Sequence, residues 1–512
     1  MSVAKVKLKD FPATFWIANT MEIFERMAWY GFFAVSSLYI TGSVEEGGLG
    51  FSDEDRGVLQ GVVTFFLYLF PVVSGALADR YGFKKLLYAA FSILVPAYYL
   101  LGQLKTFPTF FFAFMLVAIG AGTFKPVIIG TISKTTDERT GSMGFGIFYM
   151  MVNIGGFIGP IVAGIMRAIS WEYVFYASAG WVLVNFIFVT FFYKEPIIQT
   201  EDLQKRTLKD VFGGMVEVLG NGRFFLFIFG LLLVLVLGSK FTSDGTFTWN
   251  QIIMFSALWV AVNVAFDFIL KKSRQPRKSW FFQPMKIGDW RFSLFLLLMS
   301  GFWTSFNQIY YTLPLYIRDF TDTSDLFNLF QNILGSIGLT GVADSLNDGM
   351  VTAGQVNPEY IININAGAII FFQVAVSWLV TRLKPFTTIF WGTMITVVSM
   401  AILIWGTTGY IVAAGITVFS FGEMMASPKS KEYTGRIAPP DKVALYMGYF
   451  YWCVALGNLF GGILSGQLYG AFARDMQRPD IMWGIFALIA LGTALLIFLY
   501  DKKVIKKRVP AN

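Results

Sequence analysis

The stretch MEIFERMAWYG, residues 21–31, decides the fold class because it places three charged side chains inside an apolar segment. The residues around it, Phe11 to Ile40, are apolar enough to cross a bilayer, and Glu22, Glu25 and Arg26 lie near their middle. A charge at that depth costs about 2.5–3.5 kcal/mol even on a lenient insertion scale. The cluster is therefore either a buried ion pair that joins two helices or part of a path for something polar, and we favour the path.

If this segment is helical, its charged side chains share one face with two aromatic rings. That face carries Glu22, Glu25, Arg26, Trp29 and Tyr30. Glu22 and Arg26 stand one turn apart, so the sequence predicts that they interact.

The composition sets the class of protein. The chain has 512 residues, of which 55% are hydrophobic and only 14% are charged, whereas soluble domains carry about 25% charged residues. We therefore expect a polytopic membrane protein. The basic residues behind the net charge of +8 flank the apolar segments, so they indicate membrane topology and not a nucleic-acid partner.

The scarcity of two residue types limits the possible chemistry. The chain has no histidine and a single cysteine, Cys453, which leaves no basis for a disulfide framework or a cysteine metal cluster. We expect no metal and no cofactor, and any proton must be carried by carboxylates.

The apolar segments repeat in two sets. A span needs about 20 apolar residues, and such blocks lie near residues 11–40, 57–78, 85–103, 107–133, 142–167 and 172–193, then near 290–316, 358–381, 386–406, 409–428, 443–471 and 481–500. Two further apolar runs, near 223–239 and 249–270, lie between the sets. This count predicts an all-α integral membrane protein with 6+6 transmembrane helices, as in a major-facilitator transporter, plus two extra helices, 14 in total.

The same count divides the chain into three parts. Residues 1–195 are expected to form an N-terminal six-helix bundle, and residues 287–512 a C-terminal one. Residues 196–286 would hold a polar cytoplasmic segment, 200–218, followed by the two extra transmembrane helices. The loop 319–358 is too long to be a simple connector and contains a possible amphipathic helix around residues 326–334.

The charges of the loops alternate along the chain. Basic loops such as Lys271–Lys278 alternate with loops poor in lysine and arginine, and no base lies between Asp319 and Glu359. Since basic loops stay inside, both termini should be cytoplasmic, in the inner (plasma) membrane of a bacterium.

The segment GALADRYGFKK, residues 75–85, joins the second and third spans. It resembles the cytoplasmic loop signature of the major facilitator superfamily. The resemblance implies that Asp79 and Arg80 act as a conformational latch that holds the two halves of the molecule together in the outward-facing state.

The first span resembles the E-x-x-E-R-F-x-Y-Y-G motif of the proton-dependent oligopeptide transporters of that superfamily. Other matches follow in the family's order: GAGTFKP at 120–126, FYMMVNIGG at 148–156, Asn357-Pro358, and Gly422-Glu423 with Ser427-Pro428. The extra helix pair is also typical of bacterial members. The chain is identified as a divergent member of this family, with the resemblance covering nearly all of it.

The resemblance implies roles for the charged residues. Glu22, Glu25, Arg26 and Lys125 would couple proton binding to recognition of a peptide carboxylate, with Arg26 and Lys125 receiving that carboxylate. Glu423, in the second half, would receive the amino end of the peptide. A lone lysine deep in a span also needs a carboxylate partner on physical grounds, and Glu22 or Glu25 is the expected one.

The remaining substrate-binding candidates are uncharged. The resemblance implies hydrogen bonds to the ligand from Tyr30, Tyr68, Asn153, Asn307 and Asn357. Three of them have a simpler alternative: Tyr68 could be a packing aromatic, and Asn153 and Asn357 could satisfy helix backbone at a kink.

Two departures from the family concern its gates. Many members carry an arginine where this chain has Phe33, and a carboxylate where it has Asn307. Any gate at these positions should therefore be apolar or hydrogen-bonded. After Pro428 the chain places Lys429, Lys431 and Glu432, which mark either the cytoplasmic end of the helix or an inner gate.

The favoured function is a proton-coupled symporter of di- or tripeptides that works by alternating access as a monomer. The alternatives are a transporter or exporter of another small zwitterion or anion, and a non-transporting scaffold or receptor of the same fold. No nucleophile elbow, histidine or metal cluster supports an enzyme. A zwitterion needs Glu423 to face Arg26 and Lys125, whereas a cavity with one pole suits an anion.

Overall fold

The computed structural model describes residues 7–137, 139–196, 221–243, 245–273, 282–285, 290–336, 350–438 and 443–505, and within these it is helical apart from one short hairpin. The predicted polar segment 200–218 and the predicted boundary at 286/287 lie outside these residues.

The first six long helices follow the six predicted spans. They are preceded by η1 (Leu8–Asp10) and comprise α1 (Ala13–Thr41), α2 (Asp53–Tyr81), α3 (Phe83–Gln103), α4 (Phe107–Lys134), α5 (Gly141–Ile169) and α6 (Trp171–Ile187), which continues into η2 (Phe188–Phe192).

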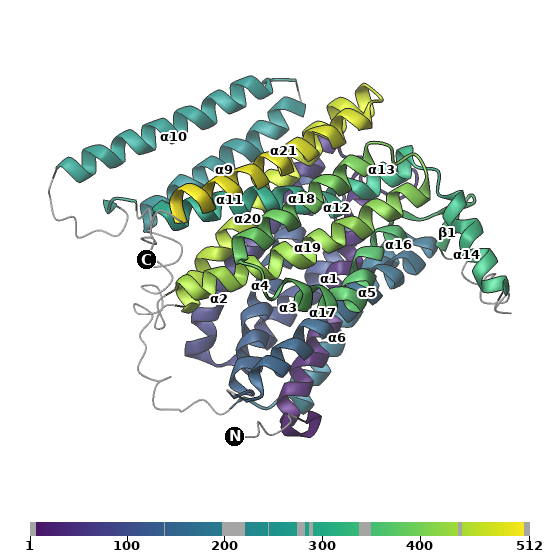
Figure 1. The fold of residues 1–512 in the computed structure, drawn as a ribbon, viewed down its shortest axis with the longest axis horizontal. Helices are drawn as coiled ribbons and strands as arrows, with labels where there is room; N and C mark the ends of the chain where they lie inside the picture. The colour runs from purple at the N-terminus through teal and green to yellow at the C-terminus, as the bar shows by residue number, and fades with distance from the viewer. Residues whose placement is uncertain are drawn as a thin grey trace.

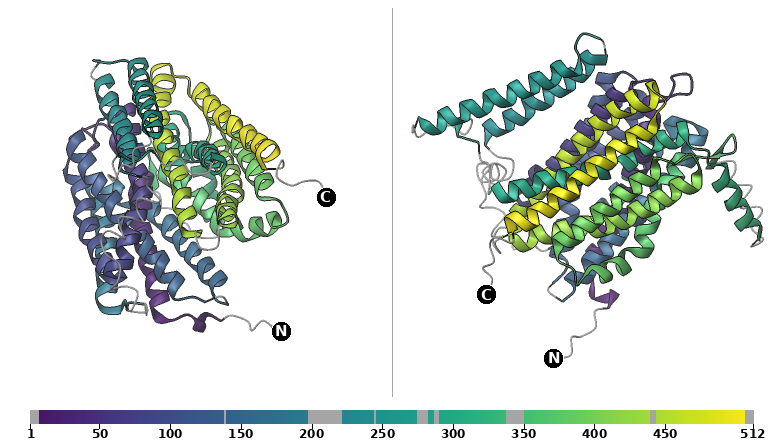
Figure 2. Two further views of the ribbon diagram at one scale, coloured as in Figure 1. Left: turned by 90° about the vertical axis from the view of Figure 1, so that its left-hand side faces the viewer. Right: turned by 45° about the horizontal axis from the view of Figure 1, so that its top comes forward.

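The extra pair forms a hairpin, α9 (Gly222–Ser243) and α10 (Trp249–Lys272). Asp267 near the end of α10 pairs with Lys271 at 3.2 Å, as the spacing of i and i+4 allows, and with Arg223 of α9 at 3.3 Å. Figures 1 and 2 show the hairpin at the edge of the bundle. Its outer side chains, such as Ile253 and Phe268, are exposed, which fits a lipid-facing position.

The second set of helices is more broken than the first. It comprises α11 (Trp290–Phe306), α12 (Gln308–Tyr311), α13 (Leu313–Phe320), α14 (Ser324–Ser336), α16 (Pro358–Ile362), α17 (Ile364–Val380), α18 (Pro385–Leu403), α19 (Gly409–Ile437), α20 (Val443–Leu468) with η5 (Tyr469–Asp475), and α21 (Pro479–Tyr500) with η6 (Asp501–Ile505). The predicted amphipathic helix in the loop 319–358 is α14, and beside it β1 (Val351–Thr352) pairs with β2 (Gln355–Val356).

Eleven described helices are long and apolar enough to cross a membrane. The other three predicted spans correspond to α1, α9 and the segment α11–α13. α1 is not among the eleven because of its charged side chains, and α11–α13 is not among them because it is divided into three shorter helices. The structure is therefore an all-α integral membrane fold, consistent with 14 segments.

The two faces of the bundle differ. We call the end that carries α14 and the β1–β2 hairpin the α14 face, and the end where α1 begins and α21 ends the tail face (Figure 1). Because the spans alternate in direction, the starts of α2, α16 and α19 and the ends of α1, α5 and α20 lie toward the α14 face.

Glycines allow close contacts between helices. A Cβ on Gly159 of α5 would lie 2.9 Å from the backbone nitrogen of Gly31 in α1, and one on Gly462 of α20 would lie 2.5 Å from the carbonyl of Gly57 in α2. Gly159 and Gly462 therefore let these helices approach each other closely. The α2–α20 contact joins the first set of helices directly to the second.

Candidate functional site

The charged residues of α1 form a compact cluster with Lys125 of α4. Lys125 Nζ donates to Glu22 Oε1 at 2.9 Å, and Arg26 Nε lies 3.5 Å from the same oxygen. Arg26 Nε also donates to Glu25 Oε2 at 2.6 Å. Glu22 is thus shared between two cations, whereas Glu25 contacts Arg26 alone among the described ion pairs. The predicted partner of Lys125 is Glu22.

Each carboxylate in this cluster has one paired and one unpaired oxygen. Glu22 and Glu25 are fully buried, and among the described atoms Glu22 Oε2 and Glu25 Oε1 have no hydrogen-bond partner. An unpaired oxygen of a buried carboxylate is costly. A proton on either oxygen would reduce that cost, and it would also remove the negative charge that holds the paired cation.

The backbone brings α5 against this cluster. A Cβ on Gly155 would lie 2.6 Å from Cβ of Arg26 and 2.5 Å from the carbonyl of Ile23, so a larger residue would separate α5 from α1. The match FYMMVNIGG therefore serves packing at its glycines. Lys125 keeps 28% of its side chain accessible, so the cluster is open on the lysine side.

Glu423 of α19 lies across from the cluster. Its Oε2 accepts a hydrogen bond from Asn365 Nδ2 of α17 at 2.9 Å. Tyr30 interacts electrostatically with both Arg26 and Glu423, and Tyr149 of α5 interacts with both Glu423 and Tyr30. Tyr149 is still 39% exposed. The region between the halves beside Tyr30 and Tyr149 therefore has a cationic cluster on its first-half side and a carboxylate on its second-half side.

Two aromatic candidates have clear partners. The guanidinium of Arg26 lies 5.7 Å from the centre of the Tyr30 ring, and Tyr30 lies near Tyr310 of α12, with ring centres 6.2 Å apart. Tyr68 of α2 stacks on Tyr451 of α20 at 6.4 Å. Tyr30 and Tyr68 both reach across the contact between the two halves.

The three asparagine candidates all bond to local groups. Asn153 Nδ2 donates to the carbonyl of Tyr149 and Asn307 Nδ2 to that of Trp303, each at 2.8 Å within its own helix. Asn357 is the N-cap of α16, and its Oδ1 accepts from Thr352 Oγ1 at 3.0 Å, beside the β1–β2 hairpin. These contacts do not bring Asn307 or Asn357 to the charged cluster.

The predicted latch lies between α2 and α3 at the tail face. The side chain of Asp79 is outside the described residues, and the guanidinium of Arg80 lies 5.2 Å from the centre of the Tyr81 ring. Glu195 holds the start of α3, since its two carboxylate oxygens accept from the backbone nitrogens of Phe83 and Lys84 at 2.5 and 3.0 Å. A carboxylate at this helix N-terminus is favourable.

At Phe33, where many family members carry a gate arginine, the contacts are aromatic. Phe33 stacks on Trp29 at 4.8 Å and lies 5.7 Å from Tyr310 and 5.8 Å from Tyr311. The expected apolar character at Phe33 matches these contacts. Ion pairs that the sequence did not predict close the same face elsewhere.

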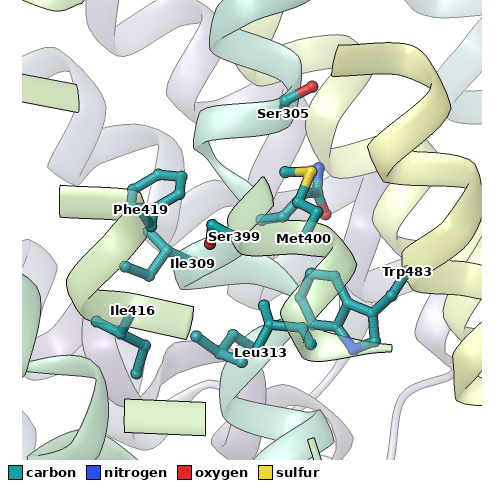
Figure 3. Close-up of a pocket in the computed structure, with 10 residues that line it drawn as sticks. Ser305, Ile309, Leu313, Ser399, Met400, Ile416, Phe419 and Trp483 are labelled. Carbon is teal, nitrogen blue, oxygen red and sulfur yellow. The ribbon is translucent and has the colours of Figure 1, made fainter. Parts of the chain in front are cut away.

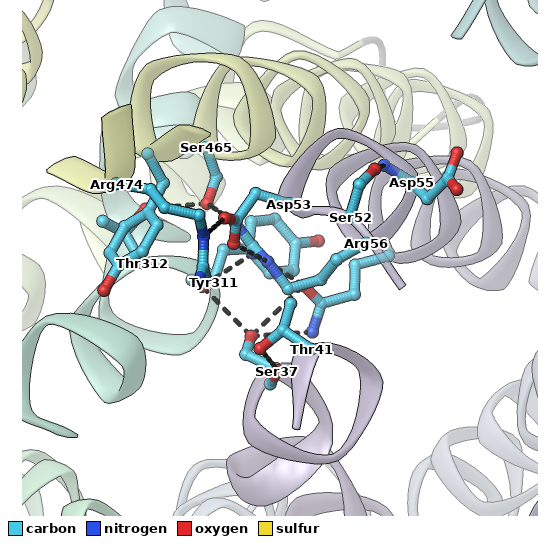
Figure 4. A network of polar contacts seen from close by, with 12 residues as sticks. Ser37, Thr41, Ser52, Asp53, Asp55, Arg56, Tyr311, Thr312, Ser465 and Arg474 are labelled. Atoms are coloured by element: carbon cyan, nitrogen blue, oxygen red, sulfur yellow. Dashed lines mark hydrogen bonds and ion pairs between the residues drawn. The ribbon is translucent and has the colours of Figure 1, made fainter. Parts of the chain in front are cut away.

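One of these closures surrounds Arg56 of α2 (Figure 4). Arg56 is fully buried and donates to the carbonyl of Tyr311 at 2.8 Å and to Ser465 Oγ of α20 at 3.1 Å. Asp53, three residues earlier on α2, pairs with Arg474 of η5 at 2.5 Å. These bonds connect α2 to three helical segments of the second half.

A second closure joins α5 to α16. Arg167 Nη1 donates to Glu359 Oε1 and Oε2 at 3.0 and 2.8 Å, and Glu359 is fully buried. The guanidinium of Arg167 also lies 5.0 Å from the centre of the Trp171 ring. Together with the Arg56 network, this pair closes the α14 face.

The charges after Pro428 separate into two groups. Lys429 pairs with Glu432 at 2.9 Å, and Arg436 pairs with Glu432 at 2.5 Å. Lys431 is exposed and interacts electrostatically with Lys125 and Glu423. Glu432 therefore serves local pairing near the end of α19, and Lys431 does not share in it.

Several residues of the site were not found from the sequence. Asn365 and Tyr310 carried no signal beyond their place in apolar spans, whereas Tyr149 lies in the matching segment FYMMVNIGG but was not singled out. Arg167 and Glu359 did carry one, since each is a charge at the end of an apolar span, and a charge there requires a partner.

The cavities found elsewhere do not overlap the charged site. One, inside the second half, has a volume of about 10 Å³ and is lined by side chains such as Ser305, Met400 and Trp483 (Figure 3), which leaves room for roughly one water. The described residues contain no group of three or more acidic or cysteine side chains placed to hold a metal ion.

Comparison with known proteins gives one family match and many relatives. The family model described as "Major Facilitator Superfamily" matches residues 20–348. The peptide transporter YePEPT of Yersinia enterocolitica is 25% identical over 483 residues, covering 87% of this chain and 86% of the relative. The di-/tripeptide transporter of Lactococcus lactis is 28% identical over 149 residues, 28% of this chain.

Two solved structures share the fold over nearly the whole chain. A POT family transporter in complex with 5-aminolevulinic acid has a TM-score of 0.68 at 17% identity, covering 97% of this chain and 99% of that one. A variant of a peptide transporter POT in complex with alafosfalin has a TM-score of 0.70 at 17% identity, covering 98% and 97%.

Proposed function

The chain belongs to the Major Facilitator Superfamily, and we propose that it is a proton-coupled symporter of di- and tripeptides of the oligopeptide-transporter type. The observation that carries this proposal is that Tyr30 interacts with Arg26 of the cationic cluster in the first half and with Glu423 in the second. The order of the family motifs and the likeness to YePEPT over most of both chains support it. The relatives are transporters, so we propose no enzymatic activity.

The two poles fit the two ends of a short peptide. The peptide carboxylate would bind Arg26 and Lys125, and the amino group would bind Glu423, which Asn365 holds in place. Tyr30 lies between the poles and interacts with both. Because one ligand would touch both halves, its binding would favour a closed arrangement of the halves over an open one.

The coupling ion would be a proton carried by the carboxylates of α1, with no other cofactor. Lys125 holds Glu22 at 2.9 Å, so a proton on Glu22 would release Lys125 toward the peptide carboxylate. The membrane potential would assist import, at about 2.3 kcal/mol per charge per 100 mV. Since 1.4 kcal/mol corresponds to about a tenfold concentration ratio, one proton suffices for accumulation.

The orientation follows from the charges of the loops. We propose an inner (plasma) membrane of a bacterium, with both termini and the tail face in the cytoplasm and the α14 face outside. The ion pairs at Arg56 and Arg167 would then close the outer side, which corresponds to an inward-facing arrangement. A monomer contains both poles and would suffice for transport.

The test is uptake of labelled dialanine into proteoliposomes that hold the purified protein. We expect accumulation with the wild type, and loss of at least tenfold in Glu423→Gln, because a neutral amide cannot pair with the peptide amino group. Lys429→Gln is the matched control, since Lys429 pairs only locally with Glu432. Saturable uptake of an anion such as lactate with no uptake of any short peptide would favour the alternative transporter of anions.

A further inference from the structure

Lys431 is a third cation of the same site. Counted from Glu423, residues 427 and 431 follow at i+4 and i+8, so Glu423, Ser427 and Lys431 form one stripe along α19. At 1.5 Å per residue, Lys431 stands about 12 Å nearer the tail face than Glu423.

Lys431 points toward the space between the halves. It interacts electrostatically with Lys125 of α4, Glu423 of α19 and Cys453 of α20, so its ammonium is within electrostatic reach of groups on three helices. It is nevertheless exposed. A side chain of α19 that is accessible and also influences Lys125 in the opposite half lies on the side of α19 toward that half.

The other charges near it already have partners. Glu432 pairs with Lys429 and Arg436, Glu22 pairs with Lys125 and Arg26, and Glu423 accepts from Asn365. No carboxylate of the described residues lies within ion-pair distance of Lys431. The charged groups that face the space are thus two cations at one pole, one carboxylate at the other, and Lys431 toward the tail face.

We propose that Lys431 binds a second anionic group of the ligand, so that the site prefers short peptides with an acidic side chain. This inference rests on the proposed function. A dipeptide bound with its carboxylate on Arg26 and Lys125 and its amino group on Glu423 keeps both side chains free, and one of them can extend toward the tail face. A carboxylate there would meet an accessible ammonium, whereas a lysine side chain would meet like charge.

The size of the preference follows from the kind of contact. A hydrogen bond to a charged group contributes about 1.5–3 kcal/mol, and an accessible cation gives the lower end because water competes. We therefore expect the acidic peptide to bind about tenfold more tightly than its neutral isostere.

The test measures binding of Ala-Glu, Ala-Gln and Ala-Lys to the detergent-purified protein by isothermal titration calorimetry. For the wild type we expect Ala-Glu to bind about tenfold more tightly than Ala-Gln, and Ala-Lys to bind more weakly than Ala-Gln. In Lys431→Gln the affinity for Ala-Glu should fall to about that for Ala-Gln, while the affinity for Ala-Gln stays unchanged. Lys429→Gln should keep the wild-type ratio of the two affinities.

The outcomes separate the two proposals. Binding of all three peptides with equal affinity in the wild type, or an Ala-Glu preference that survives in Lys431→Gln, overturns the role of Lys431 and leaves the peptide site intact. Equal weakening of all three peptides in Lys431→Gln also overturns it, because that pattern marks a gate. If no peptide binds wild-type protein that unfolds cooperatively on heating, the proposed function itself fails.

Discussion

At the scale of single residues, the arrangement of Glu22 and Glu25 distinguishes two carboxylates that the sequence leaves equivalent. Glu22 joins α1 to α4 through Lys125, whereas the described ion pairs of Glu25 stay within α1. A proton on Glu22 breaks a contact between helices, and a proton on Glu25 breaks only a contact with its neighbour. Glu22 is therefore the better candidate for the coupled proton.

Glu22→Gln should separate coupling from binding. A glutamine keeps the size of the side chain but cannot lose a proton, so we expect proton-driven accumulation of dialanine to fall at least tenfold. Exchange of labelled for unlabelled dialanine across vesicles without a gradient should persist. Glu25→Gln is the matched comparison and should retain part of the proton-driven accumulation; equal losses in both variants would contradict the assignment to Glu22.

The pair Arg167–Glu359 should control the closure of the α14 face. Arg167→Ala leaves the fully buried Glu359 without its cation, and breaking a buried pair in this way costs about 3–5 kcal/mol. We expect the α14 face to open in this variant, because opening lets water solvate the unpaired carboxylate of Glu359.

Spin labels across that face would report the opening. Val44 and Trp405 are exposed at 71% and 67% on opposite halves, and both can be replaced by cysteine after Cys453→Ser removes the single native cysteine. Arg167→Ala should lengthen or broaden the distance distribution measured by electron paramagnetic resonance. The double variant Arg167→Gln/Glu359→Gln should restore much of the closed population, and an unchanged distribution in Arg167→Ala would exclude this role.

The residue scale also shows what the sequence could and could not reveal. The partner of Lys125 was predictable because a lone buried lysine requires a carboxylate and α1 offers two. The closure at Arg56 was not, because its partners include the backbone carbonyl of Tyr311 and the hydroxyl of Ser465, and neither type of group is distinctive in a sequence.

At the scale of helices, glycine determines how closely the two halves approach. Gly57 and Gly61 of α2 face Gly462 and Gly466 of α20. Gly462 and Gly466 are four residues apart, a spacing that favours close packing, but only the structure identifies α2 as the partner, because spacing does not say which helix is the partner.

Gly462→Ala should lower the thermal stability measured by intrinsic fluorescence in detergent. The new Cβ would lie 2.5 Å from the carbonyl of Gly57, and such overpacking costs about 1–3 kcal/mol. Gly484→Ala on α21 is the matched control, because nothing lies within 4 Å of its added Cβ. Equal midpoints of thermal unfolding for the two variants would show that the α2–α20 contact is not tightly packed.

The stability of the first turn of α14 should depend on pH. Hydrogen bonds from Gln355 and Ser324 hold the pKa of Asp322 below its ordinary value. A depressed carboxyl pKa stabilises the fold above the ordinary aspartate pKa of about 3.9, and this contribution is lost as the pH falls through the lower, folded-state pKa.

Hydrogen exchange of α14, corrected for the intrinsic effect of pH on the rate, should therefore show constant protection between about pH 5 and 8 and less protection below about pH 4. Asp322→Asn should remove this pH dependence. Constant protection of the wild type down to pH 3 would contradict the role of Asp322.

At the scale of the whole molecule, the sequence predicted the membrane fold, the two sets of six helices and the extra pair, because apolar length is a strong local signal. Asn357 shows that a residue in a matching motif can lie in a place that does not fit the role implied by the family. It is the N-cap of α16 near the α14 face, so its contacts are local although it lies in a matching motif. Which side chains face the space between the halves depends on how the halves meet, which no local pattern encodes.

The architecture also explains why one peptide could drive a change of the entire molecule. The cationic pole belongs to α1 and α4, Glu423 belongs to α19, and the contacts that close the α14 face join the same two halves. In the proposed mechanism, binding and closure would therefore act on one interface. A ligand that touches only one half would bind without this linkage.

The most direct test of proton-coupled peptide transport is proton entry driven by the peptide itself. Proteoliposomes would hold a trapped pH-sensitive dye, with equal pH on both sides, a negative interior potential and dialanine added outside. The account predicts acidification of the interior that begins on addition of dialanine and is absent in Glu22→Gln. Uptake of labelled dialanine without any acidification in the wild type would contradict proton coupling.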